Sequence, residues 1–243
     1  MLPDHGPRAP QELSTRDHDL SFSALLPQSI DAVARGGIAR SQAQLVPALR
    51  AVHQALLREF LTTGRGPRAA WVSRLALRHG LEPGPAVEAL AHADLVHLNS
   101  AGHRVEIAYP LSAARSPHRV TIQDGPPLNA MCAIDALGIP LMAGTAATVV
   151  SRDPGTGRRI RVTRDRDGSW NWEPATTVVV LATTECAGPI AGACQHTEFH
   201  AAHDLGAHHL SGHPQRQGHV LTQDQALAIA KKEFGPLLGK ASR

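Results

Sequence analysis

The feature that most constrains the fold is a succession of amphipathic segments that ends in an alternating pattern of apolar and polar residues. From Ser41 to Phe60, apolar side chains recur at steps of three and four, which is the period of one face of an α-helix. Gly64 and the pair Gly66-Pro67 end this segment, and "RAAWVSRLALRHG" and "GPAVEALAHADL" predict two more helices. The stretch "DLVHLNSAGHRVEIAYPL" then alternates around a turn, as a β-hairpin does. Three helices followed by a hairpin predict a winged-helix-like domain.

After Pro110 the residue pattern changes from one typical of helices to one typical of strands. The stretch "GTAATVVSRDPGTGRRIRVTRDRDGSWNW" predicts two strands joined by a Pro-Gly-Thr-Gly turn, and "ATTVVVLAT" predicts a buried strand. Near the end, Thr222 and Gln225 have the spacing of a capping box and open an amphipathic helix. The whole chain is therefore expected to be α+β. We expect a flexible leader over residues 1–35, a winged-helix-like helical domain over 36–110, and an α+β domain over 111–243 with a small, mostly antiparallel sheet and flanking helices.

The charge pattern argues against a nucleic-acid partner. Winged helices commonly place their third helix in the DNA major groove, where cations contact phosphates and guanine edges. Here the third helical segment contains no Lys or Arg and carries Glu88 and Asp94. The formal net charge of +3 is too small to suggest nucleic-acid binding without a local basic face. A metal-responsive transcription regulator built on the winged helix stays open as an alternative function.

The cysteines and the amino terminus indicate the compartment. Three cysteines, Cys132, Cys186 and Cys194, form no CxxC pair and no disulfide framework. The amino terminus lacks the basic-then-apolar plan of a signal peptide, and no apolar run of about 18 residues is present to span a bilayer. We therefore expect a soluble cytoplasmic protein with reduced thiols and no membrane partner.

The stretch "PPLNAMCAIDALGIP" predicts a short helix that follows a loop. Asn129 is the expected N-cap, and the helix should run from about Ala130 to Leu137. Gly138 and Pro140 are expected to end it.

This helix would carry a thiol and a carboxylate on one face. Cys132 falls in its first turn, where free backbone amides and the helix dipole favour a thiolate. Asp135 follows three residues later on the same side, so both groups can address one small ligand. On the local pattern alone, a cysteine in an apolar helix is also a common buried small residue, and this interpretation stays open.

Two motifs resemble the signatures of the organomercurial (alkylmercury) lyase family. The segment "LNAMCAIDALGIPLMAGTAATV" resembles the Cys-Ala-x-Asp-x-Leu run of that family and its following Pro-x-Leu-x-Gly. The segment "GACQHTEFHAA" is similar to the second signature, a cysteine after a buried strand followed by His and Phe. The matching positions are Cys132, Ala133, Asp135, Leu137, Pro140, Met142 and Gly144 in the first motif, and Cys194, His196 and Phe199 in the second. The resemblance covers roughly residues 40 to 240, including a winged-helix-like portion ahead of the catalytic half.

The resemblance implies protonolysis of a carbon–mercury bond, with residues 111–243 as the catalytic domain. Mercury(II) is a soft ion, and thiolates bind it in preference to oxygen and nitrogen ligands. The implied catalytic residues are Cys132, Asp135 and Cys194, which also contact mercury as substrate and product. One thiolate, Cys132 or Cys194, would bind R–Hg⁺ and the other would then coordinate, while Asp135 relays a proton to the carbon. R–H and Hg²⁺ leave, and the reaction, a step in mercury detoxification, needs no organic cofactor.

The implied partners are an organomercurial substrate and the acceptors of its product. Low-molecular-weight thiols are expected to remove Hg²⁺, and a mercuric reductase is a further candidate acceptor. The chain departs from the family pattern at Gln195, where many members have a second cysteine, and at Met131, where many have an aromatic residue. The resemblance implies that activity survives the change at Gln195, which is not one of the catalytic trio, and that Met131 alters the shape of the substrate pocket.

Two other interpretations stay open. The chain has fifteen histidines, and seven of them lie between His196 and His219. A zinc site is one explanation of this cluster, although the spacing matches no standard zinc pattern; its ligands would be Cys194, His196, His200 and His203. A non-catalytic soft-metal binding protein, which holds Hg²⁺ between two thiols without releasing hydrocarbon, is the third functional alternative. Cys186 is interpreted as structural or incidental.

Overall fold

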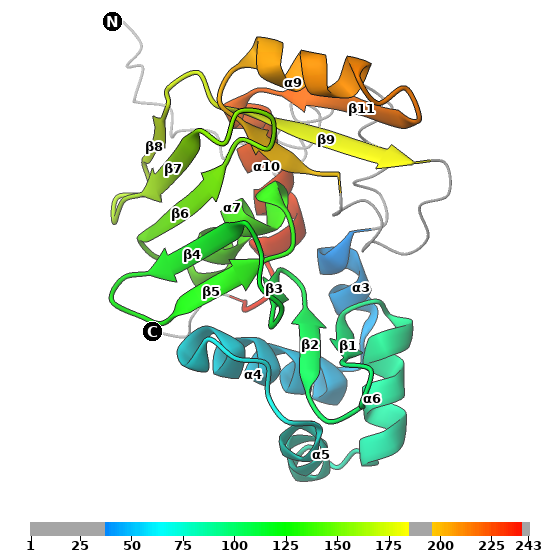
Figure 1. Ribbon diagram of the computed structural model, residues 1–243. Helices are drawn as coiled ribbons and strands as arrows, with labels where there is room; N and C mark the ends of the chain where they lie inside the picture. The colour runs from blue at the N-terminus through cyan, green and yellow to red at the C-terminus, as the bar shows by residue number, and fades with distance from the viewer. Residues whose placement is uncertain (1–36, 185–195, 240–243) are drawn as a thin grey trace, which may run out of the picture.

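The computed structural model describes residues 37–184 and 196–239, which form an α+β protein with antiparallel sheets (Figure 1). The first part is helical and ends in a hairpin, as the sequence predicts. Its elements are α3 (Ile38–Gln44), α4 (Pro47–Thr63), α5 (Ala69–Arg78), α6 (Pro83–His92), β1 (Val96–Leu98) and β2 (Val105–Ala108). The predicted leader over 1–35 lies outside the described residues, and the winged-helix assignment and the domain boundaries stay predictions.

The first predicted helix is in fact two helices. α3 ends at Gln44 and α4 begins at Pro47, and Leu45 and Val46 between them are extended. Proline disfavours the helical conformation of the residue before it and is favoured in the first position of a helix. Pro47 therefore starts a new helix inside a stretch whose apolar period is continuous.

The larger of the two sheets has eight strands. Its order is β1-β2-β3-β5-β4-β6-β7-β8, and all neighbouring strands are antiparallel. The predicted turn joins β6 and β7, as expected, but the sheet is larger than expected because the hairpin belongs to it. Ile107 of β2 pairs with Ser112 of β3 and thereby joins the two halves of the chain. The strands after the hairpin are β3 (Leu111–Ser112), β4 (His118–Ile122), β5 (Pro127–Ala130), β6 (Ala147–Arg152), β7 (Arg159–Arg164) and β8 (Trp170–Glu173).

A second, three-stranded sheet contains the predicted buried strand at its centre. β9 (Val178–Thr184) lies between β10 (Glu198–His200) and β11 (Arg216–Leu221). The histidine-rich segment supplies β10 and α9 (His203–Ser211), and α9 packs against the three strands of this sheet. The last helix, α10 (Gln223–Phe234), begins with the predicted capping box of Thr222 and Gln225.

Helix α7 (Ala133–Ala143) is the centre of the core. It packs against β4 and β5 on one side and against α10 on another (Figure 1). Nearly all its side chains are buried, as expected for a helix that is apolar around its whole circumference. A Cβ atom on Gly138 would lie 2.1 Å from the ring of Phe234, so glycine at this position lets α10 approach α7 closely.

Two buried histidines are expected to make the fold sensitive to acid. His53 of α4 has its Nδ1 atom 2.8 Å from Gln42 Nε2, and His118 of β4 has its Nδ1 atom 2.9 Å from Ser151 Oγ. Burial lowers the pKa of both histidines from 6.5 to about 4. Both rings are therefore neutral in the folded protein at pH values where the unfolded chain already binds a proton.

The free energy of unfolding is expected to fall as the pH drops from 6.5 toward 4. In this window the two histidines bind protons in the unfolded state but not in the folded state. The stabilisation from the neutral rings is therefore fully present above pH 6.5 and is lost on acidification. By pH 4.5 each of the two histidines should remove about 2.5 kcal/mol. Urea unfolding at pH 7 and pH 4.5 measures the change, and His118→Asn should remove the share of His118, about 2.5 kcal/mol, from the pH dependence. Equal stability at both pH values would contradict this account.

Candidate functional site

Cys132 is the N-cap of α7, not a residue of its first turn. Its backbone is extended, with φ −146° and ψ 178°, and its Sγ accepts the backbone N–H of Asp135 at 3.4 Å. The predicted start of the helix at Ala130 is wrong, because Asn129 and Ala130 pair with β4 as part of β5. Strand pairing with distant residues overrides the local capping signal of Asn129.

The predicted end of this helix is also wrong. α7 continues through Gly138 and Pro140 and ends at Ala143, with Gly144 in the left-handed conformation at φ 66°. Gly138 accommodates the ring of Phe234, so the residue that suggested a helix end is required by packing. Gly144 is the residue that ends the helix, which is the position and conformation that favour glycine.

The structure brings the predicted thiol and carboxylate to the same end of this helix. Cys132 is 3% exposed and Asp135, in the first turn, is 2% exposed. The free N–H groups and the dipole of a helix amino terminus stabilise negative charge there. A soft donor and a proton-carrying group thus share a buried site whose electrostatics suit anions.

Strand β10 passes directly beside this site. The backbone N–H of Ala133 donates to the carbonyl oxygen of Thr197 at 3.0 Å, and Thr197 is buried. The next residue but one, Phe199, packs edge-on against His118 and Trp172, with ring centroids 5.7 and 6.1 Å away. The second predicted thiol, Cys194, and Cys186 lie outside the described residues.

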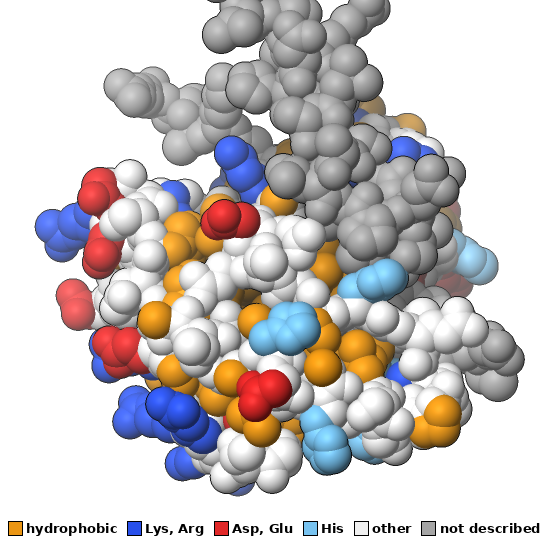
Figure 2. Space-filling model, turned by 90° about the horizontal axis from the view of Figure 1, so that it is seen from above, with side chains coloured by type: hydrophobic (Ala, Val, Ile, Leu, Met, Phe, Trp, Pro, Cys, Tyr) orange, Lys and Arg blue, Asp and Glu red, His pale blue; other side chains and the backbone are white. Residues whose placement is uncertain are grey.

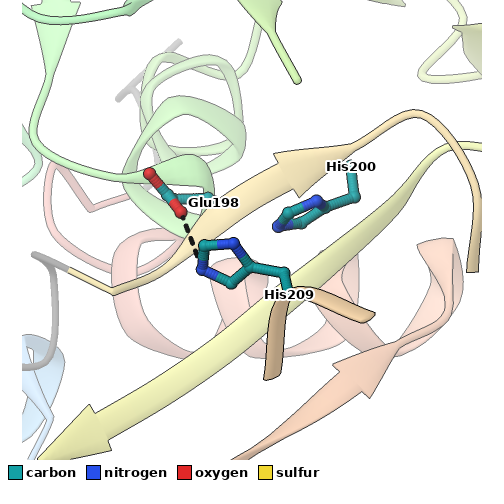
Figure 3. Close-up of side chains that lie close together, drawn as sticks. All are labelled: Glu198, His200 and His209. Carbon is teal, nitrogen blue, oxygen red and sulfur yellow. Dashed lines mark ion pairs between the residues drawn. The ribbon is translucent and has the colours of Figure 1, made fainter. Parts of the chain in front are cut away.

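A second cluster of chemically capable side chains is present on the opposite side of β10. Glu198, His200 and His209 each offer one ligand atom, and these three atoms lie within 4.8 Å of one another (Figure 3). The zinc site considered from the sequence includes His200, but its other expected ligands are His196, His203 and Cys194. His203 is exposed at the start of α9, and Glu198 and His209 were missed. The alternation of Glu198 and His200 along a strand was the available signal.

Burial controls the protonation of this cluster. Burial raises the pKa of Glu198 and lowers the pKa of His200. The negative charge of Asp153 partly offsets the lowering of the pKa of His200. The pKa of His209 is lowered to about 4, first by burial and then by the neighbouring positive charges, chiefly of His200 and Arg216. His209 is therefore neutral at pH 7.

Within the described ranges, no helix has both the length and the apolar composition needed to cross a bilayer.

Comparisons with known proteins identify relatives over most of the chain. The family model "Alkylmercury lyase" matches residues 111–235. An alkylmercury lyase of Staphylococcus epidermidis is 29% identical over 140 residues, which is 55% of this chain and 63% of the relative. One from Streptomyces lividans is 36% identical over 100 residues, covering 41% of this chain and 46% of the relative. One from Bacillus cereus is 28% identical over 185 residues, covering 76% of this chain and 80% of the relative. The alignments thus span less than two thirds of the first two relatives and four fifths of the third.

A solved structure shares the fold. The mercury-bound form of MerB2 superimposes with a TM-score of 0.68 at 20% sequence identity, covering 85% of this chain and 98% of that chain. At this identity the likeness concerns the fold alone, that is, the arrangement of helices and strands.

Proposed function

The chain belongs to the alkylmercury lyase family, and on that premise we propose that it is an organomercurial lyase. The reaction is R–Hg⁺ + H⁺ → R–H + Hg²⁺, a protonolysis of the carbon–mercury bond. The observation that carries the proposal is the buried pair at the amino terminus of α7, where Cys132 Sγ accepts the N–H of Asp135 at 3.4 Å. The same pair was the centre of the sequence resemblance.

The thiol of Cys132 has the chemistry to hold the substrate. Mercury(II) binds thiolates more strongly than oxygen or nitrogen donors, and a helix amino terminus favours the thiolate form. At 3% exposure, the sulfur lies where little water competes for the ion. A bound R–Hg⁺ would thus be held by a covalent S–Hg bond in a largely dry site.

Cys194 is proposed as the second thiolate. It precedes Thr197 by three residues, and the carbonyl of Thr197 accepts the N–H of Ala133, the residue after Cys132. The proposed convergence of both sulfurs on one ion therefore requires a reach of only three residues, at most about 11 Å of chain. Two sulfur donors raise the electron density on mercury and weaken its bond to carbon.

Asp135 is proposed to move the proton. When the second thiol coordinates mercury, its proton passes to the carboxylate of Asp135. The carboxyl group then protonates the carbon atom, the Hg–C bond breaks with its electron pair on carbon, and R–H leaves. Hg²⁺ stays on the two thiolates until small thiols or a mercuric reductase remove it, and we propose that this takes place in the cytoplasm.

The transcription-regulator alternative is not favoured. Its recognition helix would be α6, which contains Glu88 and no Lys or Arg. The family match instead covers the half of the chain that carries the thiol and the carboxylate.

The pure protein, incubated with phenylmercury and excess small thiol, is expected to release benzene, measured by gas chromatography against a thiol-only blank. Cys194→Ser should lose this activity, because one sulfur cannot supply both donors. Cys186→Ser is the matched control, since this cysteine belongs to neither signature and should be dispensable. Benzene release no faster than in the blank would refute the lyase assignment.

A further inference from the structure

The three members of the second cluster come from two elements that face each other. Glu198 and His200 are two residues apart in β10, so their side chains project from the same face of the strand. Phe199 between them points the other way, into the core, where it contacts Trp172. His209 comes from α9, which packs on this sheet, and its ring lies beside that of His200 with centroids 4.9 Å apart (Figure 3).

Gly206 explains how α9 comes so close to the sheet. A Cβ atom at this position would lie 3.1 Å from Val180 Cγ2 and 3.3 Å from Val220 Cγ1, so a larger residue would lift the helix. His209 is three residues further on and thus on the same face of α9 as Gly206. The close packing of Gly206 thereby sets the distance of His209 from β10.

His200 has unused coordinating capacity in a fully buried position. It is 1% exposed, and within the described residues neither of its ring nitrogens has a hydrogen-bond partner. Its Nδ1 atom lies 3.6 Å from Asp153 Oδ2, an ion-pair distance too long for a hydrogen bond. Buried polar atoms normally have partners, so such an imidazole suggests a ligand that satisfies it.

We propose that Glu198, His200 and His209 bind a divalent first-row transition ion, with Zn²⁺ as the reference case. Imidazole nitrogen and carboxylate oxygen are standard zinc ligands at about 2.0–2.2 Å, which places two ligand atoms of a tetrahedral ion about 3.4 Å apart. Glu198 Oε2 and His209 Nε2 are already 3.4 Å apart, and the ligand atoms, all within 4.8 Å of one another, need to approach by at most about 1.4 Å. Three protein ligands leave a fourth position for water or another donor.

The neighbours of the cluster fit this site. Asp153 faces His200 Nδ1 and is fixed by N–H groups of Gly155, Thr156 and Ala201, so its carboxylate can orient the imidazole ring toward a bound ion. The described donors include no sulfur, which makes the site a poor competitor with thiols for mercury. This ion is therefore distinct from the substrate of the proposed reaction, and the inference does not depend on that reaction.

Arg216 is the group that the ion has to displace. Its Nη1 donates to His209 Nε2 at 2.7 Å, so the guanidinium occupies one lone pair that the ion needs. Its positive charge also compensates Glu198, which lies beside the same ring nitrogen. Removing Arg216 should therefore strengthen metal binding, whereas it would weaken a cluster whose only role is electrostatic.

The exposed histidines of α9 are the natural control. Seen from the side of α9 and β11, histidine side chains are spread over the surface (Figure 2). His203 and His208 are both exposed, and surface imidazoles bind transition ions weakly without a built site. A specific site at Glu198, His200 and His209 should bind the ion equally well after His203 and His208 are replaced.

The reduced full chain is expected to bind one Zn²⁺ by calorimetry and to melt about 5 to 10 °C higher at an ion concentration 100 times Kd. His209→Gln should raise Kd at least about 100-fold, while Arg216→Gln lowers it about tenfold or more. The double variant His203→Gln/His208→Gln and Cys132→Ser should bind as the wild type does. With Co²⁺ in place of Zn²⁺ in Cys132→Ser, which lacks one of the two proposed mercury thiolates, the absorption spectrum should lack the intense near-ultraviolet band of thiolate ligands.

Three results would overturn the inference. They are the absence of Zn²⁺ binding in the wild type, the loss of binding in Cys132→Ser, and unchanged binding in His209→Gln. Because His209 is half-buried, His209→Gln is not expected to prevent folding, and its circular dichroism and melting curve without metal check this directly. Organomercurial cleavage is not a readout here, so this test can fail while the proposed function stands.

Discussion

An Asp135→Asn variant is expected to bind organomercurials normally and to release hydrocarbon about 10²–10⁴-fold more slowly than the wild type. Asparagine has the size of aspartate but cannot carry the proton that the carbon must receive. The side chain is buried at 2% exposure, so an isosteric change preserves the packing of α7. Single-turnover benzene release from phenylmercury measures the chemical step, and mercury retained after gel filtration measures binding.

Asp224→Asn provides the matched control for this variant. Asp224 is also an acidic residue in the first turn of a helix, α10, but it is exposed. Its replacement removes the same charge from a comparable position and should leave the rate unchanged. An Asp135→Asn enzyme that turned over at the wild-type rate would remove this carboxylate from the mechanism, whatever the control did.

The largest effect is expected from Cys132→Ser, with a loss of about 10⁴-fold or more, the scale of nucleophile deletions in other enzymes. The hydroxyl oxygen is a hard donor, is not ionised at neutral pH, and cannot compete with external thiols for mercury. Serine is nevertheless among the best N-cap residues. The variant should therefore keep the cap of α7 and melt at or above the wild-type temperature, while benzene release falls to the blank.

Cys132→Ala separates the two roles of this side chain. Alanine removes both the sulfur and the cap, so this variant should lose activity and about 1 kcal/mol of stability as well. The contrast between the serine and alanine variants shows that the activity loss does not arise from unfolding. A Cys132→Ser protein that kept a few per cent of the rate would assign the essential thiolate elsewhere.

The parts of the fold that were predictable are those that local periodicity determines. The helices α4 to α6, the hairpin, the β6–β7 turn and the capping box of Thr222 each leave a pattern within a dozen residues. The errors occurred where distant contacts decide the local structure. Asn129 has the residue type of a helix cap, but in the structure it pairs with β4. Gly138 has the residue type of a helix end, but it lies inside α7, where the ring of Phe234 packs on it.

The same distinction between local and distant contacts explains why one of the two clusters was predictable from the sequence and the other was not. Cys132 and Asp135 are three residues apart in one helix, so sequence spacing and family resemblance were enough to pair them. His209 joins Glu198 and His200 only because α9 folds back over β10, and the intervening residues contain no spacing that indicates this. Their proximity follows from the packing of Gly206 against the sheet, which is invisible in a single sequence.

The pairing of β2 with β3 has a mechanical consequence. Since the hairpin is hydrogen-bonded to the strands that support α7, the amino-terminal helices cannot swing away from the thiol as a rigid flap without breaking backbone hydrogen bonds. In the proposed reaction, substrate entry and hydrocarbon escape would then depend on smaller movements of side chains and loops, and both halves of the polypeptide should melt in a single cooperative transition.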